Sequence, residues 1–79
     1  MKTQATAVWS SPITLTQREI MQVQNGGPVI VAFGDTAPAD NEDGVIYRDE
    51  AIWVVENGEI IRLRAPSGNC TIYRGPYLA

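Results

Sequence analysis

The sequence predicts an all-β fold: a small antiparallel β-sandwich or jelly-roll-like barrel of about six short strands with an extended N-terminal arm. Short runs rich in β-branched and aromatic residues recur along the chain, turn residues separate them, and no stretch sustains a 3.6-residue period. At 79 residues the chain is long enough for one domain only. We expect an arm over residues 1–12, an antiparallel β domain over 13–75 and a C-terminal tail over 76–79.

Residues 1–12 have neither an alternating nor a helical pattern, and they end in Ser-Ser-Pro, which favours an extended arm anchored by Trp9. Beyond the arm, apolar residues at 13, 15, 21 and 23 share one parity while polar residues occupy the other, which indicates a strand interrupted near Gln17. A short helix over 16–24, capped by Thr16, is the alternative.

Residues 25–28, Asn-Gly-Gly-Pro, form a dense turn signal. The following strand, 29–34, is apolar on both faces, so we expect it at the centre of a sheet or covered by a neighbouring subunit. A polar loop over 35–44 then leads to a strand at 45–47, a charged turn at 48–50 and a further strand over 51–56.

Asn57-Gly58 separates the strand over 51–56 from a strand over 59–65. This dipeptide suits a type I′ turn, so the two strands are predicted to form a β-hairpin. A turn at 66–69 precedes the last strand, 70–74, and Gly75-Pro76 ends it.

Composition narrows the possible chemistry. One cysteine forms no internal disulfide, and the absence of histidine leaves no ligand set for structural zinc and no general base of that type. Without such a base, Cys70 is expected to be a small core residue rather than a nucleophile. We therefore expect no enzyme, no catalytic residue and no cofactor.

The acidic loop was compared with an EF-hand. Aligning Gly44 with the sixth position places Asn41, Asp43 and Glu50 at ligand positions, but Ala39 stands where the first carboxylate belongs. No metal site is expected. The chain also has neither a secretory signal nor an apolar run long enough to cross a membrane, which predicts a soluble protein made in the cytoplasm.

Charge is distributed unevenly. The net charge of −3 combines an acidic segment, residues 35–59, with a final segment, 60–79, whose charged residues are all arginines. These charges either decorate solvated faces or complement one another between subunits. A strip of Arg62, Arg64, Arg74 and Tyr73 could contact nucleic acid, but the overall acidity and pairing with strand carboxylates argue against it.

Partners are expected to supply stability, because so small a chain buries little surface and lacks staples. Trp9 in the arm and the apolar tail dock either on the chain's own body or on a neighbour, and the apolar runs at 29–33 and 51–55 offer further contact surface. A sugar-binding platform built on Trp9, Trp53 or Tyr47 is the alternative use of these aromatics. The residues expected at interfaces are Trp9, Trp53, Tyr77, Leu78, Arg62 and Arg64.

The order of motifs resembles that of small tailed-bacteriophage virion proteins. The resemblance covers about residues 18–75 and lies in VAFGDTAP at 31–38, the glycine at 44, YRDEAI at 47–52 and RAPSG at 64–68. It implies a non-enzymatic β-sandwich or jelly-roll-like component of a virion that decorates or cements a capsid, or else belongs to a tail or fibre part that binds carbohydrate or another surface.

Its partners would be further copies of itself and major capsid or tail proteins, without nucleic acid or membrane. It would be synthesised in the host bacterial cytoplasm. The motifs mark turns, so no binding residue is carried over from the family.

Overall fold

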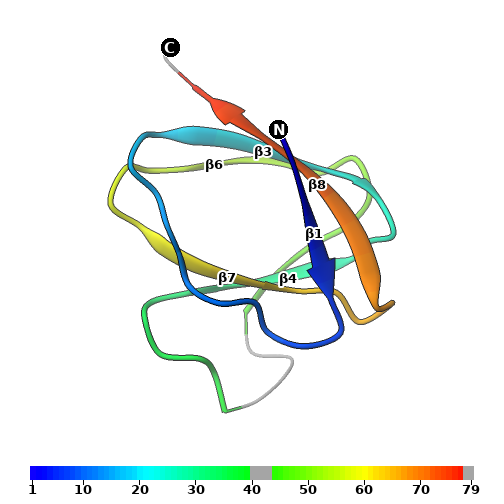
Figure 1. The fold of residues 1–79 in the computed structure, drawn as a ribbon. Coiled ribbons are helices and arrows are strands. Elements are labelled where there is room, and N and C mark those ends of the chain that lie inside the picture. The colour runs from blue at the N-terminus through cyan, green and yellow to red at the C-terminus, as the bar shows by residue number, and fades with distance from the viewer. Residues whose placement is uncertain (40–43, 78–79) are drawn as a thin grey trace.

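The computed structural model describes residues 1–39 and 44–77, and these form two layers of β-sheet that face each other (Figure 1). Eight strands make up the layers. Their bounds are β1 Lys2–Thr6, β2 Ile13–Thr14, β3 Glu19–Asn25, β4 Val29–Phe33, β5 Val45–Tyr47, β6 Ile52–Val55, β7 Ile60–Arg64 and β8 Asn69–Pro76.

Strand order in the two sheets defines a jelly roll. One sheet has the order β1-β8-β3-β6 and the other β2-β7-β4-β5, and every pairing is antiparallel. The first strand therefore pairs with the last, the second with the seventh, and so on inward to β4 and β5, as when one long hairpin is rolled into a double sheet. The predicted all-β sandwich or jelly-roll class is confirmed, with eight strands where about six were expected.

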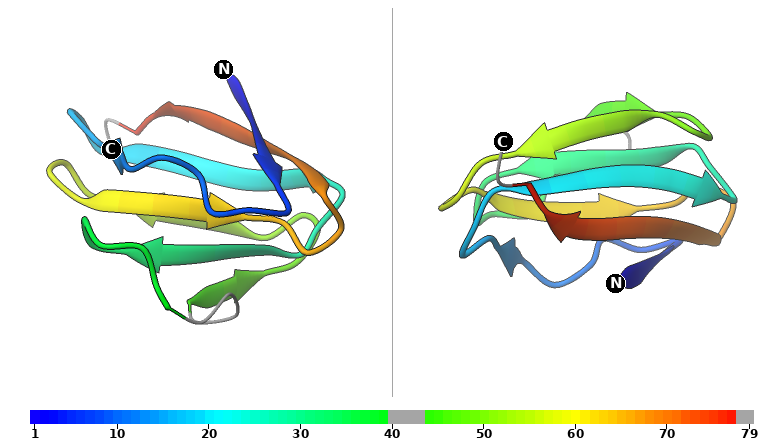
Figure 2. Two further views of the ribbon diagram at one scale, coloured as in Figure 1. Left: turned by 60° about the horizontal axis from the view of Figure 1, so that its bottom comes forward. Right: turned by 90° about the horizontal axis from the view of Figure 1, so that it is seen from above.

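The core lies between the sheets because each strand turns alternate side chains inward. In β7, Ile61 and Leu63 are fully buried, while Arg62 and Arg64, which alternate with them, are partly exposed. Met21 and Val23 of β3 face them from the other sheet, together with Ile72 of β8. Figure 2 shows the same two layers from two further directions. No helix occurs in residues 1–39 or 44–77, and β3 occupies most of the segment for which a helix was the alternative.

The N-terminal segment, expected as an extended arm that docks on the chain's own body or on a neighbour, contains a strand of the sandwich itself. Residues Lys2–Thr6 pair in register with β8, and Ala5 is buried opposite Cys70. Beyond β1 the chain crosses to the other sheet and follows β7, where the Ser10 N–H donates to the Leu63 carbonyl at 2.9 Å. The polar sequence of β1 shows no alternation because this edge strand buries only one small apolar side chain.

The predicted hairpin at Asn57-Gly58 was also wrong, although the turn itself is present. Gly58 has φ of 90°, and the Glu59 N–H donates to the Glu56 carbonyl at 3.2 Å. The strands on either side then enter different sheets, β6 beside β3 and β7 beside β4. Hydrogen bonds from the turn to Leu15 hold it in place. Asn57 does not have a positive φ, so the turn is not the type I′ that a two-residue hairpin favours, and it connects the two layers instead.

Candidate interaction surface

Trp53 belongs to the core rather than to an exposed contact surface. Its side chain is 8% exposed and stacks on Tyr47, with ring centroids 3.9 Å apart and planes 5° from parallel. The stack joins β6 of one sheet to β5 of the other and closes this side of the sandwich. The stack also involves two of the three rings, Trp9, Trp53 and Tyr47, considered for the alternative sugar-binding platform. The Nε1 of Trp53 is buried without a hydrogen-bond partner.

Arg62 of β7 holds two loops against the outer face of its sheet. Arg62 donates to the carbonyl of Ser10 at 3.2 Å and to that of Asp35 at 3.1 Å, so it ties the β1–β2 connection and the loop after β4 to the same strand. Arg64 lies opposite Ile30 in the register with β4. Both arginines are partly buried. Because Arg62 also bonds to two loops of its own chain, it is a structural residue of the subunit.

The outer face of β4 is covered by the chain itself. Ile30 and Ala32 point away from the core yet are 2% and 7% exposed. Gly44 lies so close to the Val31 carbonyl and the Ile30 side chain that a Cβ there would collide with both. The expectation that strand 29–34 lies at the centre of a sheet is confirmed, since β4 has β7 on one side and β5 on the other.

The remaining predicted contact residues lie at the ends of the chain. Trp9 is half-buried, and its Nε1 is buried without a hydrogen-bond partner. Tyr77 is exposed, while its N–H donates to the Arg18 carbonyl at 3.0 Å, which extends the β3–β8 ladder by one pair. Leu78 lies outside the described residues. The structure thus does not bring Trp9, Trp53 and Tyr77 into one surface.

A different set of exposed apolar side chains lies on the two edge strands β5 and β6, which the Tyr47–Trp53 stack holds side by side. The exposed fractions are 45% for Val45, 52% for Ile46, 60% for Ile52 and 41% for Val54. We call these four residues the apolar edge. On the opposite side, strands β1 and β2 present the polar residues Lys2, Gln4, Thr6 and Thr14, while the exposed Met1 and Val8 flank β1.

The apolar edge escaped the list of expected contact residues because sequence analysis favoured aromatic side chains. The relevant signal was present: residues 51–55 were recognised as apolar on both faces. Trp53 and Val55 occupy the inward parity, which leaves Ile52 and Val54 on the outside.

The backbone of β6 is also open on this side. The Val23 N–H donates to the Ala51 carbonyl at 3.1 Å and the Val23 carbonyl accepts from the Glu50 N–H at 2.8 Å, so Glu50 and Ala51 together oppose Val23 as a β-bulge just before β6. Beyond the bulge, hydrogen-bonded pairs alternate with non-bonded ones, so Trp53 and Val55 direct their N–H and C=O groups toward β3. The corresponding groups of Ile52 and Val54 point to the free edge. Within Ile52–Val55 there is no charge or proline, two of the features with which edge strands ordinarily discourage pairing, and the bulge lies before the strand begins.

The apolar surface continues from β6 across the outer face of its sheet. Ile20 lies between Val54 and Gly75 in the registers with β6 and β8. The Tyr73 ring lies over Gly75, where a Cβ would collide with the phenol oxygen. Tyr73 is 37% exposed and has Gln22 and Lys2 as its neighbours on the adjoining strands.

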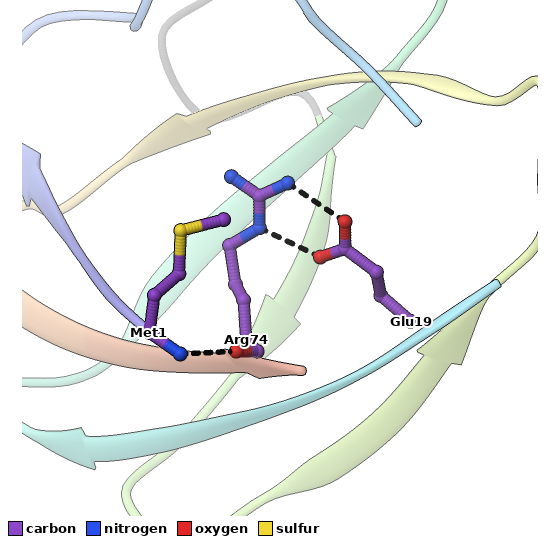
Figure 3. A network of polar contacts seen from close by, with 3 residues as sticks. All are labelled: Met1, Glu19 and Arg74. Atoms are coloured by element: carbon purple, nitrogen blue, oxygen red, sulfur yellow. Dashed lines mark hydrogen bonds and ion pairs between the residues drawn. The ribbon is translucent and has the colours of Figure 1, made fainter. Parts of the chain in front are cut away.

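A buried ion pair fixes one end of the sandwich interior (Figure 3). Arg74 donates from Nε to Oε1 of Glu19 at 2.8 Å and from its second terminal nitrogen to Oε2 at 3.0 Å. The two side chains are only 11% and 8% exposed. The backbone of Arg74 also accepts a 2.7 Å hydrogen bond from the Met1 ammonium. This bidentate pair locks β3 and β8 in register while the Met1 contact adds β1.

Cys70 is a fully buried core residue, as predicted. Burial, followed by the negative charge of Asp49, raises the pKa of its thiol, which keeps the sulfur protonated and unreactive near neutral pH. Among the described residues no cluster of three or more metal-ligating side chains occurs. The loop positions compared with an EF-hand, 41 and 43, lie outside the described part of the chain.

An open pocket of about 240 Å³ adjoins the apolar edge, between β4, β5 and the loop that connects them. Its lining residues within the described part of the chain include Phe33, Pro38, Val45 and Thr36, and none of those described residues is titratable. Within residues 1–39 and 44–77, no helix has the length and apolar character needed to cross a membrane.

Comparisons of the chain with protein-family models, with curated proteins and with solved structures gave no match. The fold and the apolar edge therefore rest on the chain's own sequence and structure.

Proposed function

We propose that the chain is a non-enzymatic structural protein of a bacteriophage particle, a capsid decoration or cement subunit that stabilises the shell through contacts between subunits. The observation that carries the proposal is the apolar edge: four exposed aliphatic side chains on the edge strands β5 and β6 of the jelly roll. Exposed apolar groups of this kind mark contact surfaces. The order of turn motifs, which resembles that of small virion proteins, adds to it.

The mechanism would be mechanical. A subunit that binds across a joint between shell proteins stabilises the joined state by mass action, without any reaction. Each aliphatic side chain removed from water contributes about 1.5 to 3 kcal/mol when fully buried, so a few such residues in many copies suffice to reinforce a shell. The protein would be made in the host bacterial cytoplasm and end in the virion.

A mass-spectrometric inventory of phage particles from cultures that produce the chain tests this directly. A fixed number of copies per particle supports the proposal, and absence from purified particles contradicts it. Particles with and without the chain would then be heated to compare their disruption temperatures. A decoration subunit raises that temperature, and a passenger protein leaves it unchanged.

A tail- or fibre-associated module that binds carbohydrate or another surface is the second candidate, favoured by Tyr73. Its exposed ring on a flat sheet, next to the amide of Gln22 and the ammonium of Lys2, has the composition of a sugar-stacking position. A glycan array probed with the wild type and with Tyr73→Ala decides this. Binding that disappears in the variant favours the module, and no binding by the wild type removes it.

A further inference from the structure

We propose that two copies of the chain join through β6 in antiparallel fashion about a two-fold axis at Trp53, so that the two four-stranded sheets become one continuous eight-stranded sheet. The inference stands apart from the proposed function, because a chain that pairs in this way need not belong to a virion.

The backbone of β6 is self-complementary in this arrangement. With Trp53 at the axis, Ile52 of one copy lies opposite Val54 of the other. These are the two residues whose N–H and C=O groups point to the free edge, so each Ile52–Val54 pair exchanges both of its N–H···O bonds. Groups that otherwise bond only to water thus extend the ladder.

The side chains match as well. Ile52 and Val54 project on the outer face of the sheet, so the pairing sets β-branched residues against each other across the new joint. Ile46 lies opposite Ile30 and so projects from the outer face of the other sheet, away from Ile52 and Val54. The joint therefore buries chiefly Ile52 and Val54 of each copy against the same residues of its partner.

Head-to-tail pairing of β6 with β1 of another copy is the competing arrangement. It would place Ile52 and Val54 against the polar side chains of Thr6 and Gln4, and so would bury far less apolar surface. It could bring Lys2 to Glu56, but Glu56 already bonds to Arg18 at 2.9 Å. The apolar term therefore decides in favour of the two-fold joint.

The joint is expected to be weak. A stable interface engages about 20 to 30 residues on each side, whereas this one has a four-residue strand and a few neighbouring side chains. A dissociation constant of about 0.1 to 1 mM is therefore expected. The charged residues near the ends of β6 have a net negative charge: Asp49, Glu50, Glu56 and Glu59 with Arg18 and Arg48. Two copies therefore repel each other at the joint, and added salt, which screens this repulsion, should strengthen the association.

Sedimentation equilibrium of the full chain, from about 20 µM to about 2 mM, tests the proposal. The wild type should move from monomer to dimer and no further. Val54→Lys, which places a charge on the open edge, should raise the dissociation constant at least about tenfold. Thr6→Lys adds the same charge to the opposite edge of the same sheet and should leave the dimer intact. Circular dichroism establishes that both variants are folded.

Amide exchange of the wild type gives a reading without any substitution. The N–H groups of Ile52 and Val54 should become protected as protein concentration rises, while those of Trp53 and Val55 are protected throughout. A wild type that stays monomeric at about 2 mM overturns the proposal. So does a Val54→Lys variant that associates normally, or a Thr6→Lys variant that abolishes species larger than a dimer, since the latter would establish head-to-tail pairing.

Discussion

Replacing Arg74 by methionine should remove a large part of the stability of this fold. The Glu19 side chain is only 8% exposed. The substitution leaves its carboxylate without the two hydrogen bonds, of 2.8 and 3.0 Å, that it accepts from Arg74. Breaking a buried pair in this way costs about 3 to 5 kcal/mol. A chain of 79 residues has a total stability of about 4 to 12 kcal/mol, so Arg74→Met should lose from about a quarter of the stability to all of it.

Two further variants separate charge burial from lost packing. The double variant Glu19→Leu/Arg74→Met removes both charges, and its stability should return to within about 1 kcal/mol of the wild type or exceed it. Glu56→Gln breaks an exposed ion pair, since the Arg18 side chain is 42% exposed and the Glu56 side chain 62%. This variant should cost less than about 1 kcal/mol.

Urea unfolding followed by tryptophan fluorescence measures all of these, since Trp53 reports on the core. The reasoning is refuted if Arg74→Met costs no more than Glu56→Gln, or if the double variant is as unstable as the single one. Either result would mean that the buried pair between β3 and β8 contributes no more to the free energy of unfolding than a surface ion pair does.

The remaining predictions concern backbone geometry and pH. Gly26→Ala should destabilise the protein by more than about 2 kcal/mol, because φ is +79° and the new Cβ would collide with the Asn69 carbonyl. Gly58→Ala should cost about 1 kcal/mol, because φ is +90° but the space around the new Cβ is open. Thermal unfolding of the two variants measures the difference. Burial raises the pKa of the Cys70 thiol, so its contribution is complete below the unfolded-state pKa of about 8.5 and declines as pH rises above it. Between pH 7 and pH 10 the wild type should therefore lose more stability than Cys70→Ala, and equal losses would contradict this.

Local signals in the sequence located most strands and turns but not the partners of the strands. The break near Gln17 is present, as β2 ends at Thr14 and β3 begins at Glu19. The Asn57-Gly58 turn is also in its expected place. What the dipeptide could not specify is whether the strands beside it pair with each other or with strands distant in sequence, because inward residues on both strands meet one shared core in either case.

The same limit applies to the N-terminal segment and to the contact residues. Lys-Thr-Gln-Ala-Thr becomes a strand only because β8 offers it an edge, a fact that no local pattern contains. Trp53 was predicted at an interface on the strength of its size, and it is buried because its ring fits against Tyr47. The exposed role falls instead to the smaller neighbours Ile52 and Val54, whose parity alone distinguishes them.

The position of β8 between β1 and β3 has a consequence for the order in which the protein is completed during synthesis. β2, β4, β5 and β7 have all been translated by residue 64, so one sheet has its full set of strands before the ribosome reaches Asn69. The other sheet lacks a central strand until then, and β1, the first segment to emerge, waits for the last. A chain stalled or cut before residue 69 would leave β1 without a hydrogen-bonded neighbour in its sheet, with β3 open on one side. Such truncated products should be good substrates for proteases even though they contain every strand except β8.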